Sequence, residues 1–205
     1  GGRPILDFSL EAFSRAQAID DIIIVVADDH RQRVADIVAE RAYGKVSALV
    51  TGGVKRFDST HAALTHLAGK DGHVLVHDAA RPFLQQETIS GCVEALQTFD
   101  AVATVVDSPD TIVMLDESRV SIERTLDRDS LRRLQTPQAF RLGVLAKAVD
   151  LARRDPELKS TDDFTLVQHY LPEASTTFID GDARTFKVTT PEDLIIAEAF
   201  LAAGL

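Results

Sequence analysis

The sequence predicts an α/β protein in which helices alternate with the strands of a doubly wound, mostly parallel sheet. Apolar, largely β-branched runs recur along the 205 residues, at 22–26, 46–50, 74–76 and 101–106. Segments with helical spacing of apolar side chains separate these runs, and such an alternation favours parallel strands joined by crossover helices. The first run, Ile-Ile-Ile-Val-Val, is apolar throughout, as expected of a strand that is covered on both faces.

The residues between the early strands carry signals for helix starts. Apolar residues at 6, 10 and 13 have helical spacing. The Asp-Asp pair at 28–29 can cap the next helix, and Asp-Ser at 58–59 opens another. The helices expected in this half of the chain cover 5–13, 30–41, 58–67 and 87–99.

The alternation breaks after residue 106. Two strand-like runs, 111–115 and 119–125, surround an Asp-Glu-Ser turn, which predicts a β-hairpin arm within 107–128 that projects from the sheet. An isolated two-stranded ribbon is only marginally stable in water. We therefore expect this arm to pack on a partner subunit.

The last third of the chain returns to helices and strands in alternation. Pro191 at a first helical position, with Thr190 as the cap, predicts the start of the last helix. The elements expected here are helices over 142–154, 161–169 and 191–203 and a short strand over 176–179.

Composition is that of an ordinary globular domain and excludes several classes of function. Hydrophobic residues make up 45% and charged residues 26%, which suits one domain with a sizeable core. The net charge of -10 argues against a nucleic-acid surface. The single cysteine, Cys92, excludes an internal disulfide, and no structural metal site is expected. With no membrane-spanning run and no signal-peptide pattern, we expect a cytoplasmic protein that binds no membrane.

Residues 73–83 are the stretch around which the chain is organised. A buried strand runs into Asp78, two alanines and Arg81, and ligands of α/β sheets bind at the carboxyl ends of strands. The acid can hold hydroxyls or a metal, the small pair lets a ligand approach the backbone, and the arginine suits phosphate. A strand-to-helix turn with a structural Asp-Arg pair explains the same residues.

Further motifs indicate anion binding less strongly. Gly52 and Gly53 stand at a strand end before Ser59, where free helix-start amides attract anions or polar base edges. Lys187 stands at a strand end and can neutralise a phosphate. A capped turn and a solvated lysine are the simpler readings. Arginines at 124–128 and 135–141 either pair with acids or form an anion pocket, and spacing does not decide between these.

Taken together, these motifs resemble the 2-C-methyl-D-erythritol 4-phosphate cytidylyltransferases of the non-mevalonate isoprenoid pathway. The matching segments occur in the family's order and span nearly the whole chain: 52–59, 77–83 (His-Asp-Ala-Ala-Arg-Pro-Phe), 136–138, 161–163 and 187–193. The resemblance implies a Rossmann-like fold of the nucleotide-diphospho-sugar transferase type. It also implies a homodimer in which the arm reaches into the partner's site.

The same resemblance implies an enzyme that transfers CMP from CTP to 2-C-methyl-D-erythritol 4-phosphate, giving 4-diphosphocytidyl-2-C-methyl-D-erythritol and pyrophosphate. By resemblance, the nucleotide would contact Gly52, Gly53, Ser59, Asp78 and Ala79. Magnesium is expected to bridge the CTP phosphates, without a dedicated protein metal site.

The polyol phosphate would contact residues of both subunits. By resemblance, Arg81, Thr161 and Lys187 line its pocket, and Thr125 with Arg141 approaches from the other subunit. The residues expected to carry catalysis are Lys187, Arg141, Asp78 and Arg81.

One departure from the family concerns the start of the chain. Family members begin with a strand and a glycine-rich loop that wraps the triphosphate, and residue 1 corresponds to a position just after them. We expect this strand and loop to be missing from the sequence as given, which without them would be inactive. Two alternatives stay open: a ribitol-5-phosphate cytidylyltransferase, and a non-catalytic, nucleotide-binding dimeric scaffold.

Overall fold

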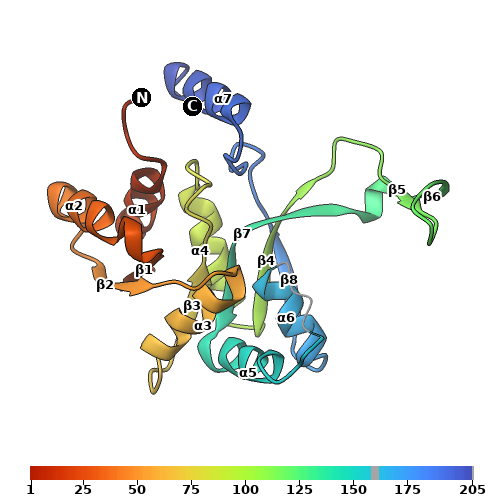
Figure 1. Ribbon diagram of the computed structural model, residues 1–205, viewed down its shortest axis with the longest axis horizontal. Coiled ribbons are helices and arrows are strands. Elements are labelled where there is room, and N and C mark those ends of the chain that lie inside the picture. The colour runs from red at the N-terminus through yellow and green to blue at the C-terminus, as the bar shows by residue number, and fades with distance from the viewer. Residues whose placement is uncertain (158–161, 205) are drawn as a thin grey trace.

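The computed structural model describes residues 1–157 and 162–204, with helices packed around a mixed sheet (Figure 1). The helices are α1 (Ile5–Arg15), α2 (Arg31–Arg41), α3 (Arg56–His66), α4 (Gln86–Ala95), α5 (Leu142–Ala152), α6 (Asp163–Tyr170) and α7 (Pro191–Ala202). The strands are β1 (Ile22–Val26), β2 (Val46–Thr51), β3 (His73–Val76), β4 (Ala101–Asp107), β5 (Val113–Leu115), β6 (Ile122–Thr125), β7 (Arg132–Arg141) and β8 (Thr176–Asp180).

The strands form separate ladders in the described part of the chain. A four-stranded sheet has the order β3-β7-β4-β8, and β1 pairs with β2 in a parallel two-stranded sheet. β4 and β8 are parallel, whereas β7 is antiparallel to both β3 and β4. The protein is therefore α/β with a mixed sheet.

β7 is the strand that sequence patterning misses. Its residues include arginines at both ends and Pro137 in the middle, and proline cannot donate a ladder hydrogen bond. The register between β4 and β7 shifts opposite this proline, between Val102 and Thr104. The hydroxyl of Thr104 donates a 2.6 Å hydrogen bond to the Pro137 carbonyl, so a side chain fills part of the interrupted ladder.

Helices cover both faces of the four-stranded sheet. Alternate residues of β4 point in opposite directions, as the two-residue period of a strand requires. Ala101, Ala103 and Val105 face the larger core, which includes α5 and α6, while Val102 packs with Cys92 of α4 on the other face. Burial on both faces explains why the β4 run lacks polar alternation.

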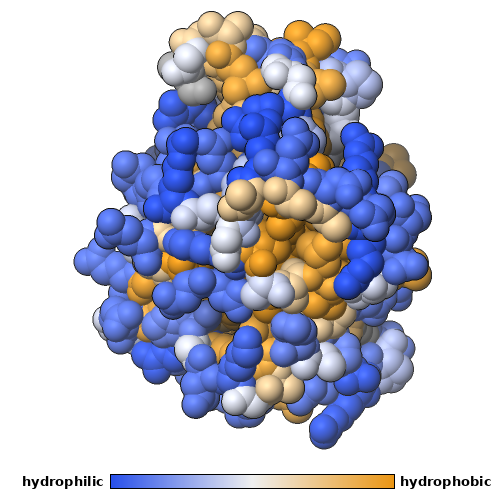
Figure 2. Space-filling view, turned by 90° about the vertical axis from the view of Figure 1, so that its left-hand side faces the viewer, coloured by the Kyte–Doolittle hydropathy of each residue, from blue (hydrophilic) through white to orange (hydrophobic). Residues whose placement is uncertain are grey.

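A cleft of about 810 Å³ separates β1 from β3. Its walls include Ile22–Val25 of β1 and residues 73–79 of β3 and the following loop. Among the described ladders, β1 pairs only with β2 and β3 only with β7, so neither strand is paired across this cleft. Figure 2 shows apolar surface gathered in a central hollow of one face, within a largely hydrophilic surround.

β5 and β6 pair antiparallel as a ladder of their own, in register Val113↔Thr125. In Figure 1 this pair lies at the right, away from the four-stranded sheet. Its apolar side chains are open to solvent, with Val120 83% and Ile122 64% exposed.

Most expected helix starts agree with the structure, and some differ. Thr190 caps α7, accepting a 3.2 Å hydrogen bond from the Asp193 amide. The cap expected from the pair at 28–29 is wrong, because these residues form a short 3₁₀ turn and make no side-chain cap to α2. α3 begins at Arg56 rather than at 58, since the Asp58 carboxylate accepts from the Lys55 amide and closes the turn before it.

None of the helices in the described ranges combines the length and the apolar character that crossing a membrane requires.

Candidate active site

Asp78, just past the end of β3, lies among three cationic side chains. Its carboxylate oxygens are 3.1 Å from Nζ of Lys187, 3.7 Å from Nε of Arg56 and 3.7 Å from Nε of Arg81. Burial alone would raise the pKa of Asp78, but the hydrogen bond and charge of Lys187, followed by the two guanidinium groups, hold that pKa below its ordinary value. We call Asp78, Arg56, Arg81 and Lys187 the cation cluster.

Hydrogen bonds to backbone carbonyls connect the segment before α7 with the loop after β3. The amide of Val188 donates to the Ala80 carbonyl at 2.8 Å, and Nη1 of Arg81 donates to the Thr185 carbonyl at 2.9 Å. The Arg81 amide also donates to the Asp78 carbonyl at 2.9 Å, which closes a tight turn. Lys187 therefore faces Asp78 although 109 positions separate the two in the chain, from 78 to 187.

Aromatic contacts support the same segment from the other side. Phe186, next to Lys187, lies 6.4 Å from the ring of Phe83 and 6.0 Å from that of Phe200 on α7. Phe83 in turn contacts Phe8 of α1 at 6.1 Å. Burial of such rings anchors the backbone on either side of the lysine while its amino group stays half-exposed.

Arg56 reaches the cluster from the first turn of α3 and is held by a second carboxylate. Its Nη1 lies 2.5 Å from Oδ2 of Asp163, whose other oxygen accepts from the Thr60 hydroxyl at 2.8 Å. Asp163 is fully buried, and burial raises its pKa despite the neighbouring guanidinium. The sequence analysis did not name Arg56 among the site residues, although it lies within the matching segment 52–59.

The glycine pair lies where the end of β2 touches the start of α3. A Cβ on Gly53 would stand 2.1 Å from Cβ of Asp58, and one on Gly52 would stand 2.8 Å from Oγ of Ser59. At Gly53 a larger residue would require the start of α3 to shift, whereas at Gly52 the Ser59 hydroxyl would have to turn away. The structure thus brings Gly52, Gly53 and Ser59 together, as the sequence analysis expected.

The large cleft opens onto these groups. Ser59, Arg56, Asp78 and Ala79 all line it, together with the apolar walls from β1 and β3. Three of the predicted nucleotide residues, Ser59, Asp78 and Ala79, therefore line the same cleft as Arg56 of the cation cluster, whereas Gly52, Gly53, Arg81 and Lys187 are not part of its lining.

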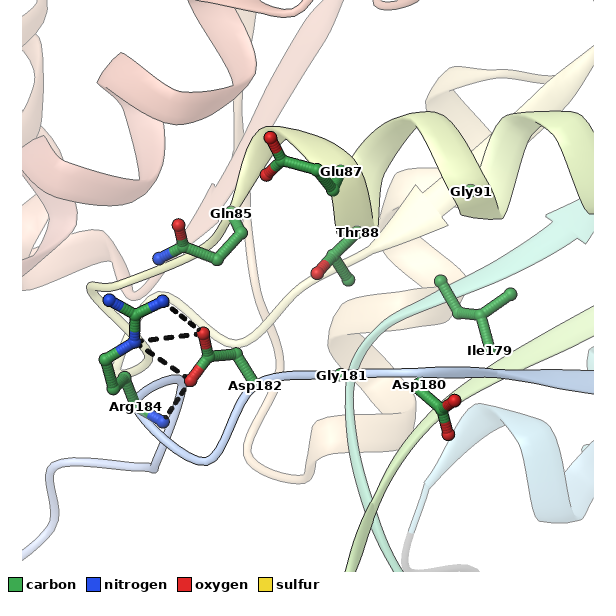
Figure 3. Close-up of a pocket in the computed structure, with 9 residues that line it drawn as sticks. All are labelled: Gln85, Glu87, Thr88, Gly91, Ile179, Asp180, Gly181, Asp182 and Arg184. Atoms are coloured by element: carbon green, nitrogen blue, oxygen red, sulfur yellow. Dashed lines mark hydrogen bonds and ion pairs between the residues drawn. The ribbon is translucent and has the colours of Figure 1, made fainter.

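A second, smaller pocket has the wrong charge for phosphate. It measures about 280 Å³ and is lined by Glu87, Asp180, Asp182 and Arg184, among others. Figure 3 shows the Arg184 side chain turned onto Asp182, with which it makes a forked ion pair. Because acids outnumber the one arginine in this lining and already engage it, the pocket does not suit an anion.

Two of the expected substrate residues, Arg141 and Thr125, are not brought to the cation cluster within the described chain. Arg141 ends β7 opposite His73, at the start of β3, and pairs with Asp100 at 3.4 Å. Thr125 is exposed on β6. Thr161 lies outside the described residues. A contribution of Arg141 and Thr125 from a partner subunit stays a prediction.

Comparison with known proteins identifies relatives over the whole chain. The model of the family described as IspD, 2-C-methyl-D-erythritol 4-phosphate cytidylyltransferase, matches residues 1–203. A protein of that name from Thermobifida fusca is 41% identical over 209 aligned residues, covering 100% of this chain and 84% of the relative. The bifunctional ribulose 5-phosphate reductase/CDP-ribitol pyrophosphorylase Bcs1 of Haemophilus influenzae is 35% identical, covering 96% of this chain and 42% of that protein.

A solved structure agrees with the fold. The crystal structure of 4-diphosphocytidyl-2C-methyl-D-erythritol synthase from Anaerococcus prevotii superposes with a TM-score of 0.92 at 33% identity, covering 98% of this chain and 87% of that one. Since the family match and the similarity to these relatives extend over the same residues that build the cleft and its cation cluster, the chain belongs to the 2-C-methyl-D-erythritol 4-phosphate cytidylyltransferase family.

Proposed function

We propose that this protein transfers CMP from CTP to 2-C-methyl-D-erythritol 4-phosphate and releases pyrophosphate. The observation that carries the proposal is the cation cluster: Lys187, Arg81 and Arg56 converge on Asp78, which lines the cleft together with Ser59 and Ala79. Joining two anions requires a place where positive charge offsets the repulsion between them.

The reaction needs positioning and charge neutralisation rather than a side-chain nucleophile. A phosphate oxygen of the substrate attacks the α-phosphorus of CTP in line, a P–O bond forms, and the bond to the bridging oxygen breaks, so that pyrophosphate leaves with the electron pair. In this proposal Lys187 and Arg81 bind the substrate phosphate and stabilise the negative charge that develops during transfer. Asp78 accepts hydrogen bonds from sugar hydroxyls and holds both cations in place.

The cytidine end is proposed to lie along the opposite side of the cleft mouth. In this proposal Gly52 and Gly53 contribute backbone groups, Ser59 supplies a hydroxyl, and Ala79 leaves room beside Asp78. Arg56, the member of the cation cluster on α3, is a further candidate to contact the triphosphate.

Magnesium is proposed to enter with CTP rather than to occupy a protein site of its own. No group of three or more His, Cys, Asp or Glu side chains that could hold a metal is found within the described ranges. Both oxygens of Asp78 already face cations. The oxygens of the triphosphate are the ligands that Mg²⁺ prefers, and the ion would offset their charge.

We propose that residues 107–128 form a dimerisation arm within a single cytidylyltransferase domain. The exposed apolar side chains of the β5–β6 pair support an interface, because they gain by burial against a second copy. In such a dimer Thr125 and Arg141 would approach the partner's substrate pocket, as the family resemblance implies.

We further propose that one more strand completes the doubly wound sheet between β1 and β3. The support is the cleft itself, whose walls include the facing, unpaired sides of both strands. The strand and glycine-rich loop expected from the family resemblance are the candidate occupant.

The test is a pyrophosphate-release assay with CTP and magnesium on protein that includes the proposed additional strand and glycine-rich loop. Methylerythritol 4-phosphate should give turnover well above ribitol 5-phosphate; the reverse preference would favour the ribitol enzyme, to which the Haemophilus relative points. Tight, magnesium-dependent CTP binding in calorimetry with neither substrate turned over would instead favour a non-catalytic scaffold.

A further inference from the structure

The ring of His77 bridges two groups at opposite ends of the loop that carries Asp78 and Arg81. Its Nδ1 lies 3.0 Å from Oγ1 of Thr136 on β7, and its Nε2 lies 3.1 Å from the carbonyl oxygen of Arg81. The Thr136 hydroxyl also meets the backbone amide of Asp78 at 3.1 Å. The imidazole thus bonds directly to Arg81, the last residue of the loop. Through the Thr136 hydroxyl it also connects to Asp78, the first residue of the loop.

The direction of each of these three hydrogen bonds follows from the chemistry of its donor and acceptor. A carbonyl oxygen only accepts, so Nε2 of His77 carries the hydrogen and donates to Arg81. In a neutral imidazole the other nitrogen then accepts, so the Thr136 hydroxyl donates to Nδ1. The hydroxyl oxygen in turn accepts from the Asp78 amide.

The ring is held in place and stays neutral near pH 7. Phe13 packs edge-on against it, with ring centroids 5.4 Å apart. Burial, the largest influence, lowers the pKa of His77 to about 4. A protonated ring would present a second N–H to the Thr136 hydroxyl, which could then no longer donate to Nδ1.

We propose that His77 is a positioning residue for CMP transfer: through Thr136 and the Arg81 carbonyl it fixes the loop so that Asp78 and Arg81 face Lys187. This inference rests on the proposed function. It extends that function to a residue that lies outside the cation cluster and touches none of its charged groups through a hydrogen bond.

The position of the ring in the loop argues for this role over that of an ordinary packed histidine. Its hydrogen bonds end on the backbone of the two residues whose side chains face the proposed reaction. The Arg81 carbonyl accepts from Nε2 of His77 at 3.1 Å and from the Ser9 hydroxyl at 3.3 Å, and the neighbouring ties run from Val188 to Ala80 and from the Arg81 side chain to Thr185. A displacement of about 1 Å at such a site can cost a hundredfold in rate.

The first test compares substitutions that keep the shape of the ring or its hydrogen bonds. In His77→Phe the ring is replaced and both nitrogens are lost, so we expect kcat to fall about 10–100-fold while KM for each substrate changes less than about threefold. His77→Asn keeps an acceptor near Nδ1 and His77→Gln keeps a donor near Nε2, and each should restore part of kcat. His66→Phe, at an exposed position on α3, is the matched control and should leave kcat unchanged.

Thr136→Val and Thr136→Ser test the same series of hydrogen bonds at its middle member, the Thr136 hydroxyl. The valine variant removes the hydroxyl at constant shape, whereas serine retains it. If His77 acts through Thr136, the effects of His77→Phe and Thr136→Val on kcat overlap in the double variant; full additivity would overturn the proposal. So would a kcat of His77→Phe equal to that of wild type.

A second test does not depend on turnover. In ¹⁵N-histidine-labelled protein, NMR should show His77 as the neutral tautomer with hydrogen on Nε2 at pH 7, identified by its loss in His77→Gln. The Nδ1–H tautomer or an imidazolium would overturn the inference. Absence of CMP transfer by the wild type would refute the proposed function while this signature still stands, so the two failures are distinguishable.

Discussion

Asp78 illustrates how a single residue can gather cations that the chain keeps far apart. It faces Lys187, Arg81 and Arg56, which come from three different segments. The side chain of Lys187 is 46% exposed, whereas that of Arg81 is 13% and that of Arg56 is 32% exposed. Lys187 is therefore the cation of this cluster whose removal disturbs packing least.

Substitution of Lys187 by alanine should separate catalysis from stability. Loss of the ammonium leaves the developing charge without its nearest point cation, so we expect kcat to fall by at least about a hundredfold. The melting temperature should change by no more than about 2 °C, because the lysine side chain is half-exposed and Asp78 keeps Arg56 and Arg81 beside it. Lys147→Ala, which removes a lysine paired only with the exposed Glu173 in the described structure, is the control. Equal turnover of the two variants would refute the role of Lys187.

His77 also predicts a pH dependence of stability. Its pKa is about 4 in the folded protein and near the ordinary 6.5 when unfolded, so between these values the unfolded state binds the extra proton. Stability is full above pH 6.5 and falls as the pH drops towards 4, by up to about 3 kcal/mol. Asp78, whose folded pKa is lowered, loses its contribution at still lower pH.

Urea unfolding at pH 7.0 and pH 4.5 measures this effect. The difference in free energy of unfolding between the two pH values should shrink in His77→Phe, which has no proton to bind. An unchanged difference would show that His77 titrates alike in the folded and unfolded states.

At the scale of elements, β7 decides how the site is built. It passes between β3 and β4 and places Thr136 beside the end of β3, where Asp78 begins the loop. It also delivers Gln138, whose buried side chain accepts from the Phe164 amide and donates to Asp162, the cap of α6. One strand thereby supports both the loop of the cation cluster and the helix that holds Arg56 through Asp163.

The proposed extra strand makes a prediction for β1 and β3. If a strand lies between them, their cleft-facing amides exchange slowly with solvent because they are paired. Hydrogen exchange followed by NMR should find these amides at least about tenfold slower than the outer-edge amides of β8, an edge strand among the described ladders. Equal exchange rates at the two edges would refute the extra strand.

At the scale of the whole molecule, the β5–β6 pair receives little packing from the rest of its own chain. It forms a ladder apart from the four-stranded sheet, and Val120 and Ile122 are mostly exposed. Two-stranded ribbons need further packing to be stable in water. The proposed homodimer supplies that packing.

Substitution of Ile122 by aspartate should therefore dissociate the proposed dimer. The charge would be buried without a partner in the interface, which strongly disfavours association. Light scattering should give the dimer mass for the wild type and the monomer mass for Ile122→Asp. Ile195→Asp, at a 70% exposed position on α7 outside the arm, is the control and should remain dimeric. A dimeric Ile122→Asp would place the interface elsewhere.

Sequence alone predicts the alternation of helices and strands, the loop at 77–83, the glycine pair and the family. These features are local: apolar periodicity, caps and turn residues act over a few neighbouring positions, so they can be read from the chain directly. Thr190 as the cap of α7 is an example that the structure bears out.

Only the tertiary structure decided that β7 enters the sheet antiparallel, that Asp163 holds Arg56 against Asp78, and that His77 joins Thr136 to Arg81. β7 carries no strand pattern because its burial on both sides, rather than its propensity, makes it a strand. The ionic and hydrogen-bonded contacts join residues far apart in the chain, such as Arg56 and Asp163, which 107 positions separate. Their energy depends on burial and distance, which the order of residues along the chain does not specify.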